Sequence, residues 1–309
     1  MKTLVLVNPA SAAGRTGRDW AAFESNFHKH LGDFDVHMTH APGEATTVAR
    51  AALAAGTERI VAVGGDGTNH EVVNGFFDPA TRCAIRPGAI FGFVPRGTGG
   101  DFGRTFGLGK DLESVLARIE ASPARPIDLI SCTFTTPAGL RWAVSINIAS
   151  AGQGGDVVAR VNRGPKWPGG AVPFAIAVVQ GTWSLKPWQL RLVVDDGPPE
   201  TALLRNIGTA NGQFQGGGMQ VAPQARVDDG ILELMAMEDV SPLNAARIGF
   251  AAYNGTAQNQ KGVWHRSIRK VLVEPLPGQP PMLVELDGEQ PGVAPVTFEV
   301  MPGALRLAV

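Results

Sequence analysis

The sequence predicts two domains, an N-terminal α/β domain with a parallel sheet and a C-terminal antiparallel β-sandwich. Three observations support this fold class. Apolar runs alternate with helical patterns as far as Ile119, which is typical of a parallel sheet covered by helices. After Pro126, many short β-like runs are separated by Gly, Pro and Asp, as in sandwiches and barrels. The 309 residues also exceed the usual length of one domain, which is about 100–200 residues.

The first half alternates strands and helices with short connections. We expect strands at Thr3–Val7, Phe34–Met38, Ile60–Val63 and Ala89–Val94, and helices at Trp20–Leu31, Glu44–Ala55, Thr68–Asn74 and Asp111–Ile119. Ligands of such sheets bind at the carboxyl ends of the strands. The turns around Asn8, Asp66 and Thr98 each follow a strand, so we expect them to converge at one edge and form a nucleotide or phosphate site.

The second half contains mainly strand patterns. We expect strands at Ile127–Phe134, Arg141–Ile148, Gln189–Val194, Ala202–Thr209, Ile231–Met237, Ile268–Val273, Met282–Leu286, Val296–Val300 and Ala304–Val309, and helices at Val172–Val179 and Pro242–Phe250. Pro123–Pro126 marks the expected boundary, which gives a nucleotide domain at residues 1–125 and a substrate domain at 126–309.

Composition narrows the function. The formal net charge of −1 provides no broad basic field for nucleic acid. Cys83 and Cys132 lack metal-ligand spacing, so we expect two reduced, separate thiols. The N-terminal apolar run is too short for a signal peptide, and no run approaches the roughly 20 apolar residues of a membrane span. We therefore expect a soluble, cytoplasmic protein.

The stretch at residues 60–75 is the centre of the predicted site. The apolar run Ile60–Val63 leads into Gly64, Gly65 and Gly67, which surround Asp66 and precede a helix start. A strand, a glycine turn and a helix N-terminus present bare backbone N–H groups to an anion. The acidic side chain can hold water or a cation beside them. A tight turn without a ligand remains the alternative.

A second glycine run follows the next predicted strand. Within Pro95–Arg104, the segment from Gly97 through Thr98 to Gly100 precedes Asp101. Glycines beside a carboxylate can again cradle phosphate and position a cation. A loop whose Asp101 caps a helix is the alternative interpretation.

Two further motifs lie in the second half. Asn211–Gly218 (NGQFQGGG) is followed by Asp229-Gly230, and Leu286–Glu289 (LDGE) places two carboxylates around a glycine. On local grounds alone, plain hairpin turns are the favoured explanation of both motifs. The P-loop, the dinucleotide G-x-G-x-x-G motif, the protein-kinase motif set and HExxH are missing, and the six histidines form no ligand pattern.

Taken together, these motifs resemble the diacylglycerol kinase catalytic-domain family, which includes bacterial lipid kinases and sphingosine kinases. The resemblance rests on NPASAAGR at the start, GGDGT at 64–68, PRGTGGDFGR at 95–104, NG…GGG…AP…DDG at 211–230 and DGE at 287–289. GGDGT alone is shared with NAD kinases, whereas the ordered set is specific. The resemblance implies an NAD kinase/diacylglycerol kinase-like fold with the active site in the cleft between an α/β domain and a β-sandwich.

The resemblance also implies residue roles. The expected ATP contacts are Asn8, Thr39, Gly65, Asp66, Gly67, Thr68, Gly97 and Thr98. Asp66 and Asp101 would belong to a network of acids, water and Mg²⁺. Asp287 would accept the proton of the lipid hydroxyl, and Glu289 would lie near the metal. Such a set meets the needs of phosphoryl transfer, namely a phosphate cradle, a cation and a carboxylate that orients the hydroxyl.

A structural Mg²⁺ position seen in bacterial members also has matching residues in this chain. The resemblance implies that the Asp229 carboxylate and the backbone carbonyls of Arg226 and Ile231 would bind this ion. The chain departs from the family at Gly100, where the family usually has Asn. The change removes an amide side chain but retains the neighbouring carboxylate of Asp101, so we expect activity to persist.

The resulting prediction is an ATP- and Mg²⁺-dependent lipid kinase acting on diacylglycerol, a sphingoid base or a related lipid. A non-catalytic lipid- or nucleotide-binding module and an NAD kinase-like enzyme are the alternatives. Gly164–Val179 and Trp183–Trp188 combine tryptophans, lysines and an apolar helix pattern. Contact with the inner membrane surface and a core helix with surface tryptophans both explain that pattern. Formation of a homodimer is left open.

Overall fold

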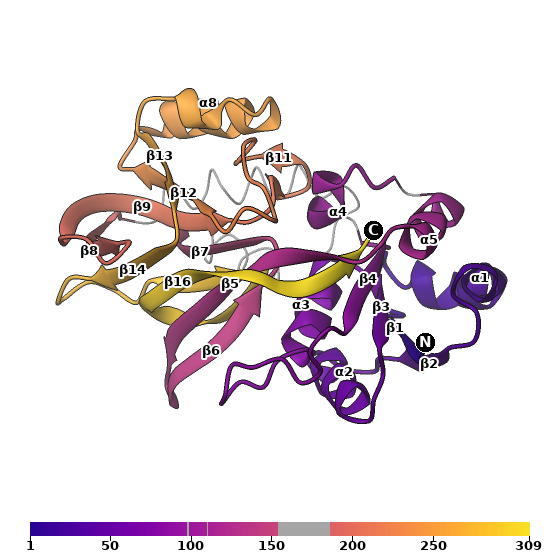
Figure 1. Cartoon of the computed structure of the whole chain (residues 1–309). Helices are drawn as coiled ribbons and strands as arrows, with labels where there is room; N and C mark the ends of the chain where they lie inside the picture. The colour runs from indigo at the N-terminus through magenta and orange to yellow at the C-terminus, as the bar shows by residue number, and fades with distance from the viewer. Residues whose placement is uncertain (98, 110, 154–185) are drawn as a thin grey trace. The chain divides into compact units, whose positions relative to one another are not determined.

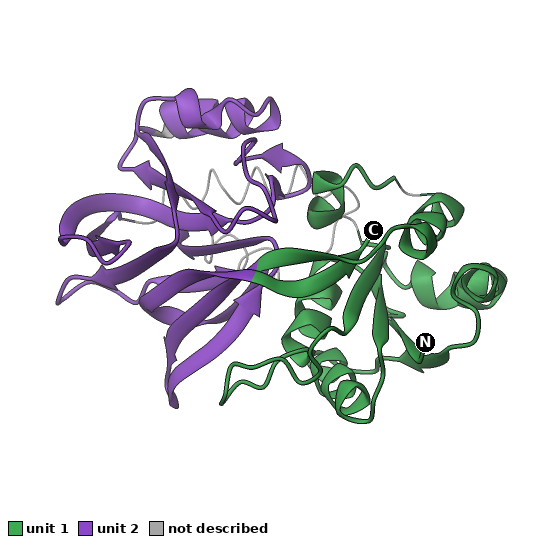
Figure 2. Cartoon of the chain, in the orientation of Figure 1, with its two compact units in different colours: residues 1–128, 303–309 green, residues 129–302 purple. Residues whose placement is uncertain are grey.

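The computed structural model describes residues 1–97, 99–109, 111–153 and 186–309 (Figure 1). The described chain divides into two compact units, Met1–Asp128 with Gly303–Val309 (unit 1) and Leu129–Pro302 (unit 2) (Figure 2). Unit 1 is α/β and unit 2 is mainly β, so the predicted fold class is confirmed. None of the helices within the described residues is both long enough and apolar enough to span a membrane.

Unit 1 is built on a parallel sheet. Its strands are β1 (Thr3–Val7), β2 (Asp35–Met38), β3 (Arg59–Gly64) and β4 (Ile90–Pro95), in the spatial order β2-β1-β3-β4. All three strand pairs are parallel, and β1 and β3 are buried along their whole length. Parallel neighbours place their carboxyl ends at one edge, as the sequence predicts.

Helices cover both faces of this sheet. The helices are α1 (Arg15–Leu31), α2 (Glu44–Ala54), α3 (Asp66–Gly75), α4 (Asp101–Thr105) and α5 (Leu112–Ala121). Trp20 and Phe27 of α1 pack with Val5 and Val61 of the sheet and Leu116 of α5. On the opposite face α2 and α3 pack against each other. The valines of β1 and β3 thus face the layer of α1 and α5, and the buried residues that alternate with them, such as Leu6 and Ile60, face the other layer.

Unit 2 is an antiparallel β structure. Its strands are β5 (Arg125–Thr136), β6 (Gly139–Ser145), β7 (Ile148–Gly152), β8 (Trp188–Val194), β9 (Glu200–Ala210), β10 (Phe214–Gln215), β11 (Met219–Gln220), β12 (Leu232–Glu238), β13 (Val263–Ile268), β14 (Lys270–Pro275), β15 (Leu283–Leu286) and β16 (Glu289–Ala308). It also contains α8 (Pro242–Tyr253) and the short 3₁₀ helix η1 (Ala257–Asn259). Alternate residues such as Leu190, Leu192, Val271 and Val273 fill its core.

Several predicted boundaries in unit 2 are wrong. The strand predicted at Arg141–Ile148 is two strands, because residues 146–147 leave the ladder and bind the carboxylate of Asp287. The strands predicted at Val296–Val300 and Ala304–Val309 form one strand, β16. β13 was not predicted, and the helix predicted at Val172–Val179 lies outside the described residues.

The last seven residues return to unit 1, whereas the sequence assigned them to the second domain. Arg306, Leu307 and Ala308 at the end of β16 pair in parallel with β4. The Gly303 N–H donates to Asp128 Oδ1 at 2.7 Å. Local residue patterns do not show which distant strands pair, so the sequence could not reveal the pairing of β16 with β4.

Candidate active site

The first glycine loop joins β3 to α3 and requires glycine for steric reasons. A Cβ atom added at Gly64 would lie 2.4 Å from the Thr68 hydroxyl oxygen. The same hydroxyl accepts a hydrogen bond of 3.0 Å from the Asn8 side chain, and the Asn8 N–H donates to Val63 O at 2.9 Å. The structure therefore brings two predicted ATP contacts, Asn8 and Thr68, together at the ends of β1 and β3.

The second glycine loop touches the first through its backbone. A Cβ atom added at Gly97 would lie 2.6 Å from Gly65 Cα, a distance that real Cβ contacts do not reach. The Arg96 N–H donates to Gly64 O at 2.7 Å beside this contact. Thr98, another predicted ATP contact, lies outside the described residues. Two glycine loops far apart in sequence thus share one edge of the sheet.

The Asp66 carboxylate holds the second loop in place. Asp66 Oδ2 accepts hydrogen bonds from the N–H groups of Gly100 at 3.0 Å and Asp101 at 3.3 Å. Its Oδ1 accepts from the Phe102 N–H at 3.5 Å. These N–H groups begin α4 and have no intrahelical acceptor, so a carboxylate there satisfies them. Asp66 therefore acts as the helix cap that the local sequence suggested for Asp101.

Asp101, Thr39 and Gly67 complete the predicted positions in unit 1. Asp101 is buried in the first turn of α4, with its Oδ1 3.5 Å from Arg104 Nε. Thr39 follows β2, and its N–H donates to Val7 O at 2.9 Å. Gly67 lies in the first turn of α3. All three residues lie next to the carboxyl ends of parallel strands or the helices that follow them.

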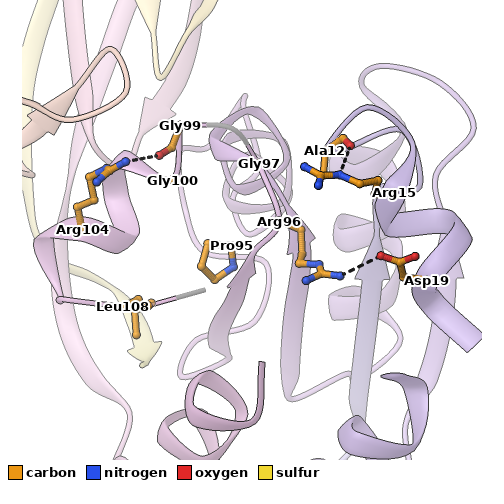
Figure 3. Close-up of a pocket in the computed structure, with 11 residues that line it drawn as sticks. Ala12, Arg15, Asp19, Pro95, Arg96, Gly97, Gly99, Gly100, Arg104 and Leu108 are labelled. Atoms are coloured by element: carbon orange, nitrogen blue, oxygen red, sulfur yellow. Dashed lines mark hydrogen bonds and ion pairs between the residues drawn. The ribbon is translucent and has the colours of Figure 1, made fainter. Parts of the chain in front are cut away.

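A pocket of about 310 Å³ lies between the loop after β1 and the loop after β4 (Figure 3). Its walls include three arginines and one carboxylate, Arg15, Arg96, Arg104 and Asp19. Figure 3 shows Arg15 and Arg96 on one side and Arg104 on the other. Guanidinium groups bind phosphate oxygens through paired N–H donors. The charge and shape of this pocket suit a polyphosphate.

Sequence reasoning missed these arginines because it weighed only glycines and acids. The Arg96 guanidinium lies 4.7 Å from the centre of the Phe23 ring and 3.7 Å from an Asp19 oxygen. Arg104 donates to Gly99 O at 3.4 Å. A usable signal was present, since both residues stand within PRGTGGDFGR.

The loop after β1 adopts strained backbone conformations. Ala12 and Ala13 have φ of 53° and 57°, and Gly14 follows with φ of 80°. Left-handed conformations cost alanine about 1–2 kcal/mol, so the surrounding contacts must maintain them. The Ser11 hydroxyl contributes by donating to Asn8 O at 2.9 Å. Ala12 lines the pocket, and strain of this kind concentrates at functional sites.

In unit 2, the Asp287 carboxylate accepts four hydrogen bonds from one turn. Asp287 Oδ1 accepts from the Ser145 hydroxyl at 2.6 Å and from the N–H groups of Asn147 at 2.9 Å and Ile148 at 3.2 Å. Oδ2 accepts from the Ile146 N–H at 3.0 Å. Asp287 itself has φ of 51°. The residues that connect β6 to β7 therefore determine the orientation of the Asp287 carboxylate.

The two other carboxylates of this turn differ in exposure. Glu289, predicted to lie near a metal, is exposed at the start of β16. Glu285 on β15 is buried, accepts from the Ser150 hydroxyl at 3.0 Å and also accepts from the Gly288 N–H. The sequence analysis missed Glu285, although its position two residues before Asp287 in VELDGE was visible.

The NGQFQGGG motif lies against the same turn. The Asn211 side chain donates to Ile146 O at 2.8 Å, and its N–H donates to Asn147 O at 2.9 Å. The Asn147 side chain in turn donates to Phe214 O at 2.9 Å. Two motifs separated by about 70 residues in the sequence therefore contact one turn beside Asp287.

The predicted structural Mg²⁺ position lies in the turn before β12. Asp229 Oδ1 accepts from the Ile231 N–H at 3.1 Å, and the exposed Arg226 side chain approaches Asp228 at 3.6 Å. A carboxylate and two carbonyl oxygens are ligands of the kind that Mg²⁺ prefers. Among the described residues no three His, Cys, Asp or Glu side chains form a metal-binding group. Any ion here would depend on backbone oxygens.

Neither cysteine is suited to act as a nucleophile. Cys83 is exposed, Cys132 is buried, and both are free thiols. Burial raises the pKa of the Cys132 thiol well above its ordinary value, and the nearby carboxylates of Asp287 and Glu285 raise it further. A thiol held in its neutral form is a poor nucleophile.

Comparison with known proteins places the chain in a family. A model of the diacylglycerol kinase catalytic domain matches residues 2–132, and a model of the YegS C-terminal NAD kinase beta sandwich-like domain matches residues 147–309. The chain belongs to the YegS-like lipid kinase family. This membership confirms the prediction of a lipid kinase, and a kinase of this family uses ATP.

Relatives of this lipid kinase cover most of its length. Proteins named "Probable lipid kinase YegS-like" are 29% identical over 273 residues in Chromohalobacter salexigens, covering 88% of this chain and 83% of the relative. The protein of the same name in Pseudomonas aeruginosa is 29% identical over 306 residues, which cover 99% of this chain and 93% of the relative. A solved diacylglycerol kinase from Bacillus anthracis is similar in fold, with a TM-score of 0.71 at 18% identity, covering 99% of this chain and 96% of that one.

Proposed function

We propose that this lipid kinase transfers the γ-phosphate of ATP, with Mg²⁺, to the hydroxyl of diacylglycerol, a sphingoid base or a related membrane lipid. The observation that carries the proposal is the arginine-lined pocket beside the two touching glycine loops of unit 1. The same reaction requires cytoplasmic ATP and a membrane lipid, so we place the enzyme at the inner membrane surface. Formation of a homodimer remains an open prediction.

Within unit 1 the chain itself would bind and orient the polyphosphate. The N-terminus of α3 and the glycine loops offer N–H groups to phosphate oxygens. Arg15, Arg96 and Arg104 add positive charge around the pocket. The Asp66 carboxylate keeps the second loop in register through three backbone hydrogen bonds. Binding and orientation supply most of the catalysis of phosphoryl transfer.

The acidic residues supply the remaining functions in this proposal. Mg²⁺ would neutralise charge that develops on the transferred phosphoryl group, and Asp66 and Asp101 of unit 1 are the acids that we expect in its network of acids and water. Asp287 would accept the proton of the attacking lipid hydroxyl. Its four hydrogen bonds to residues 145–148 orient the carboxylate before the substrate binds, which reduces the reorganisation required during transfer.

A labelling experiment tests the proposal. The protein is incubated with radiolabelled ATP, Mg²⁺ and a panel of micelle-dispersed lipid alcohols, beside Asp287→Asn. We expect one class of lipid to become labelled, and the variant to lose at least about a hundredfold in rate, as for loss of a general base. ATP affinity, measured by calorimetry, should stay within about twofold because Asp287 belongs to unit 2.

The variant needs a structural control, because an amide at position 287 faces backbone N–H donors. Ser145→Ala removes one hydrogen bond to the carboxylate and preserves the charge. If Ser145→Ala were as inactive as Asp287→Asn at unchanged thermal stability, the base role would be refuted. ATP binding without any labelled lipid would favour the non-catalytic module, and labelled NAD would favour the NAD kinase alternative.

A further inference from the structure

The helix α8 in unit 2 exposes its largest side chains. Leu243 is 63% exposed, Phe250 is 76% exposed and Tyr253 is 41% exposed. Its buried side chains are small, with Ala245 at 6% and Ala252 at 4%. A surface helix normally buries its large apolar residues and exposes its polar ones. The helix α8 has the reverse arrangement.

The exposed residues form one continuous stripe. Leu243, Arg247 and Phe250 are spaced at i, i+4 and i+7, which places them on the same helix face. Its N-terminus is well defined, since Ser241 caps it and Pro242 occupies the first turn. It packs against β11 and η1, and Figure 1 shows it as a separate layer beside β11 and β13. The three residues of the stripe stay exposed beside these contacts.

The charged side chains next to the stripe are basic. Arg247 is the one charged residue of α8, and Lys261 follows η1, which packs against α8; both side chains are exposed. The Asp239 carboxylate that precedes α8 is engaged by Arg205 at 2.6 Å. Apolar side chains combined with basic ones on a helix face are typical of helices that lie in the interface of an anionic bilayer.

We infer that α8 is a membrane-docking helix whose ligand is an anionic lipid bilayer. Leu243 and Phe250 enter the acyl region, while Arg247 contacts the lipid phosphates. This inference rests on membership of a lipid kinase family and not on the identity of the acceptor lipid. It differs from the membrane contact predicted at Gly164–Val179, which lies outside the described residues.

Flotation with lipid vesicles tests the inference. The full-length protein is mixed with vesicles of phosphatidylcholine alone or with an equal part of phosphatidylglycerol. We expect binding to the anionic vesicles, and Phe250→Asp and Leu243→Asp should each weaken it by about tenfold or more. Arg247→Glu should weaken binding to anionic vesicles at low salt and have little effect at high salt. The matched control is Leu140→Asp, since Leu140 on β6 is also an exposed leucine, at 73% exposure. We expect the Leu140→Asp variant to bind vesicles as the wild type does.

Three outcomes would overturn the inference. The wild type could fail to bind either vesicle, Phe250→Asp could bind normally, or Leu140→Asp could lose as much as Phe250→Asp. Dissociation of a dimer by Phe250→Asp with unchanged vesicle binding would instead identify a second copy as the occupant. Phosphorylation of a short-chain lipid in detergent micelles separates this test from the proposed function, because Phe250→Asp should retain that activity.

Discussion

At the residue scale, the contact between Gly65 and Gly97 explains why two glycine-rich motifs are needed. Each lies at the end of a different strand, and a side chain at either position would meet the backbone of the other. The resulting closeness places the N-terminus of α3 beside the arginine-lined pocket. Side chains would separate the two loops and displace the N–H groups that we propose to bind the phosphates.

Replacement of Gly97 by Ala should therefore damage both stability and nucleotide binding. The added Cβ lies 2.6 Å from Gly65 Cα, and neither backbone can move away without disturbing its strand. We expect a loss of about 1–3 kcal/mol in the free energy of unfolding and about a tenfold weaker ATP affinity. Urea denaturation and calorimetry measure the two effects.

The matched control is Gly249→Ala in α8, where an added Cβ has nothing within 4 Å. There the change should stabilise the helix by about 0.5–1 kcal/mol. Equal effects of the two substitutions would show that the Gly65–Gly97 contact is not tight in solution.

At the element scale, the Glu44 carboxylate at the start of α2 holds the turn that precedes this helix. The Glu44 carboxylate accepts from the His40 N–H at 2.6 Å and the Ala41 N–H at 3.1 Å, and pairs with His37 at 2.8 Å. The His40 N–H bond is the largest cause that lowers the pKa of Glu44 to about 2, followed by the His37 side chain. These contacts anchor the turn after β2, which also carries Thr39.

The contacts of Glu44 predict a pH dependence of stability. Because the pKa of Glu44 is lower in the folded chain than its ordinary value of 4.5, its stabilising contribution is present above pH 4.5. That contribution is lost as the pH falls from 4.5 towards 2. Glu44→Gln should therefore be less stable than the wild type at pH 7, and the difference should vanish near pH 2. Urea unfolding across this range measures it; a difference that persists at pH 2 would contradict the assignment.

At the scale of the whole molecule, β16 connects the two units by contributing strands to both. Its earlier residues pair with β14 and β15 in unit 2, and its last residues pair with β4 in unit 1. Leu305 and Leu307 are buried to 2% and 1% exposure. Unit 1 therefore depends on residues that lie far along the sequence from its other strands.

This dependence can be measured with Leu307→Ala. Removal of a buried leucine side chain should lower the free energy of unfolding by about 2–5 kcal/mol, and it should also weaken ATP binding at temperatures where unit 1 begins to open. The control is Leu203→Ala, because Leu203 is 45% exposed on β9 and should lose less than about 1 kcal/mol. Unfolding monitored by far-ultraviolet circular dichroism measures both variants. Equal losses in their free energy of unfolding would argue against a structural role for β16 in unit 1.

The sequence alone was sufficient for the fold class, the family and the two glycine loops. Local patterns decide these features, because the period of apolar residues distinguishes strand from helix and because glycine and proline mark turns. Thr3–Val7 and Glu44–Ala54 are examples, since each was predicted to within a residue. The motifs then identified the family, whose models match both halves of the chain.

Only the tertiary structure decided what the individual side chains contact. Asp66 caps α4 across 34 residues of sequence, Asp287 caps a turn some 140 residues away, and the end of β16 joins β4. These contacts depend on which distant segments the packed core brings together, and local propensity carries no information on that choice. For the same reason, the sequence revealed the helix α8 but not that its leucine and phenylalanine face outward.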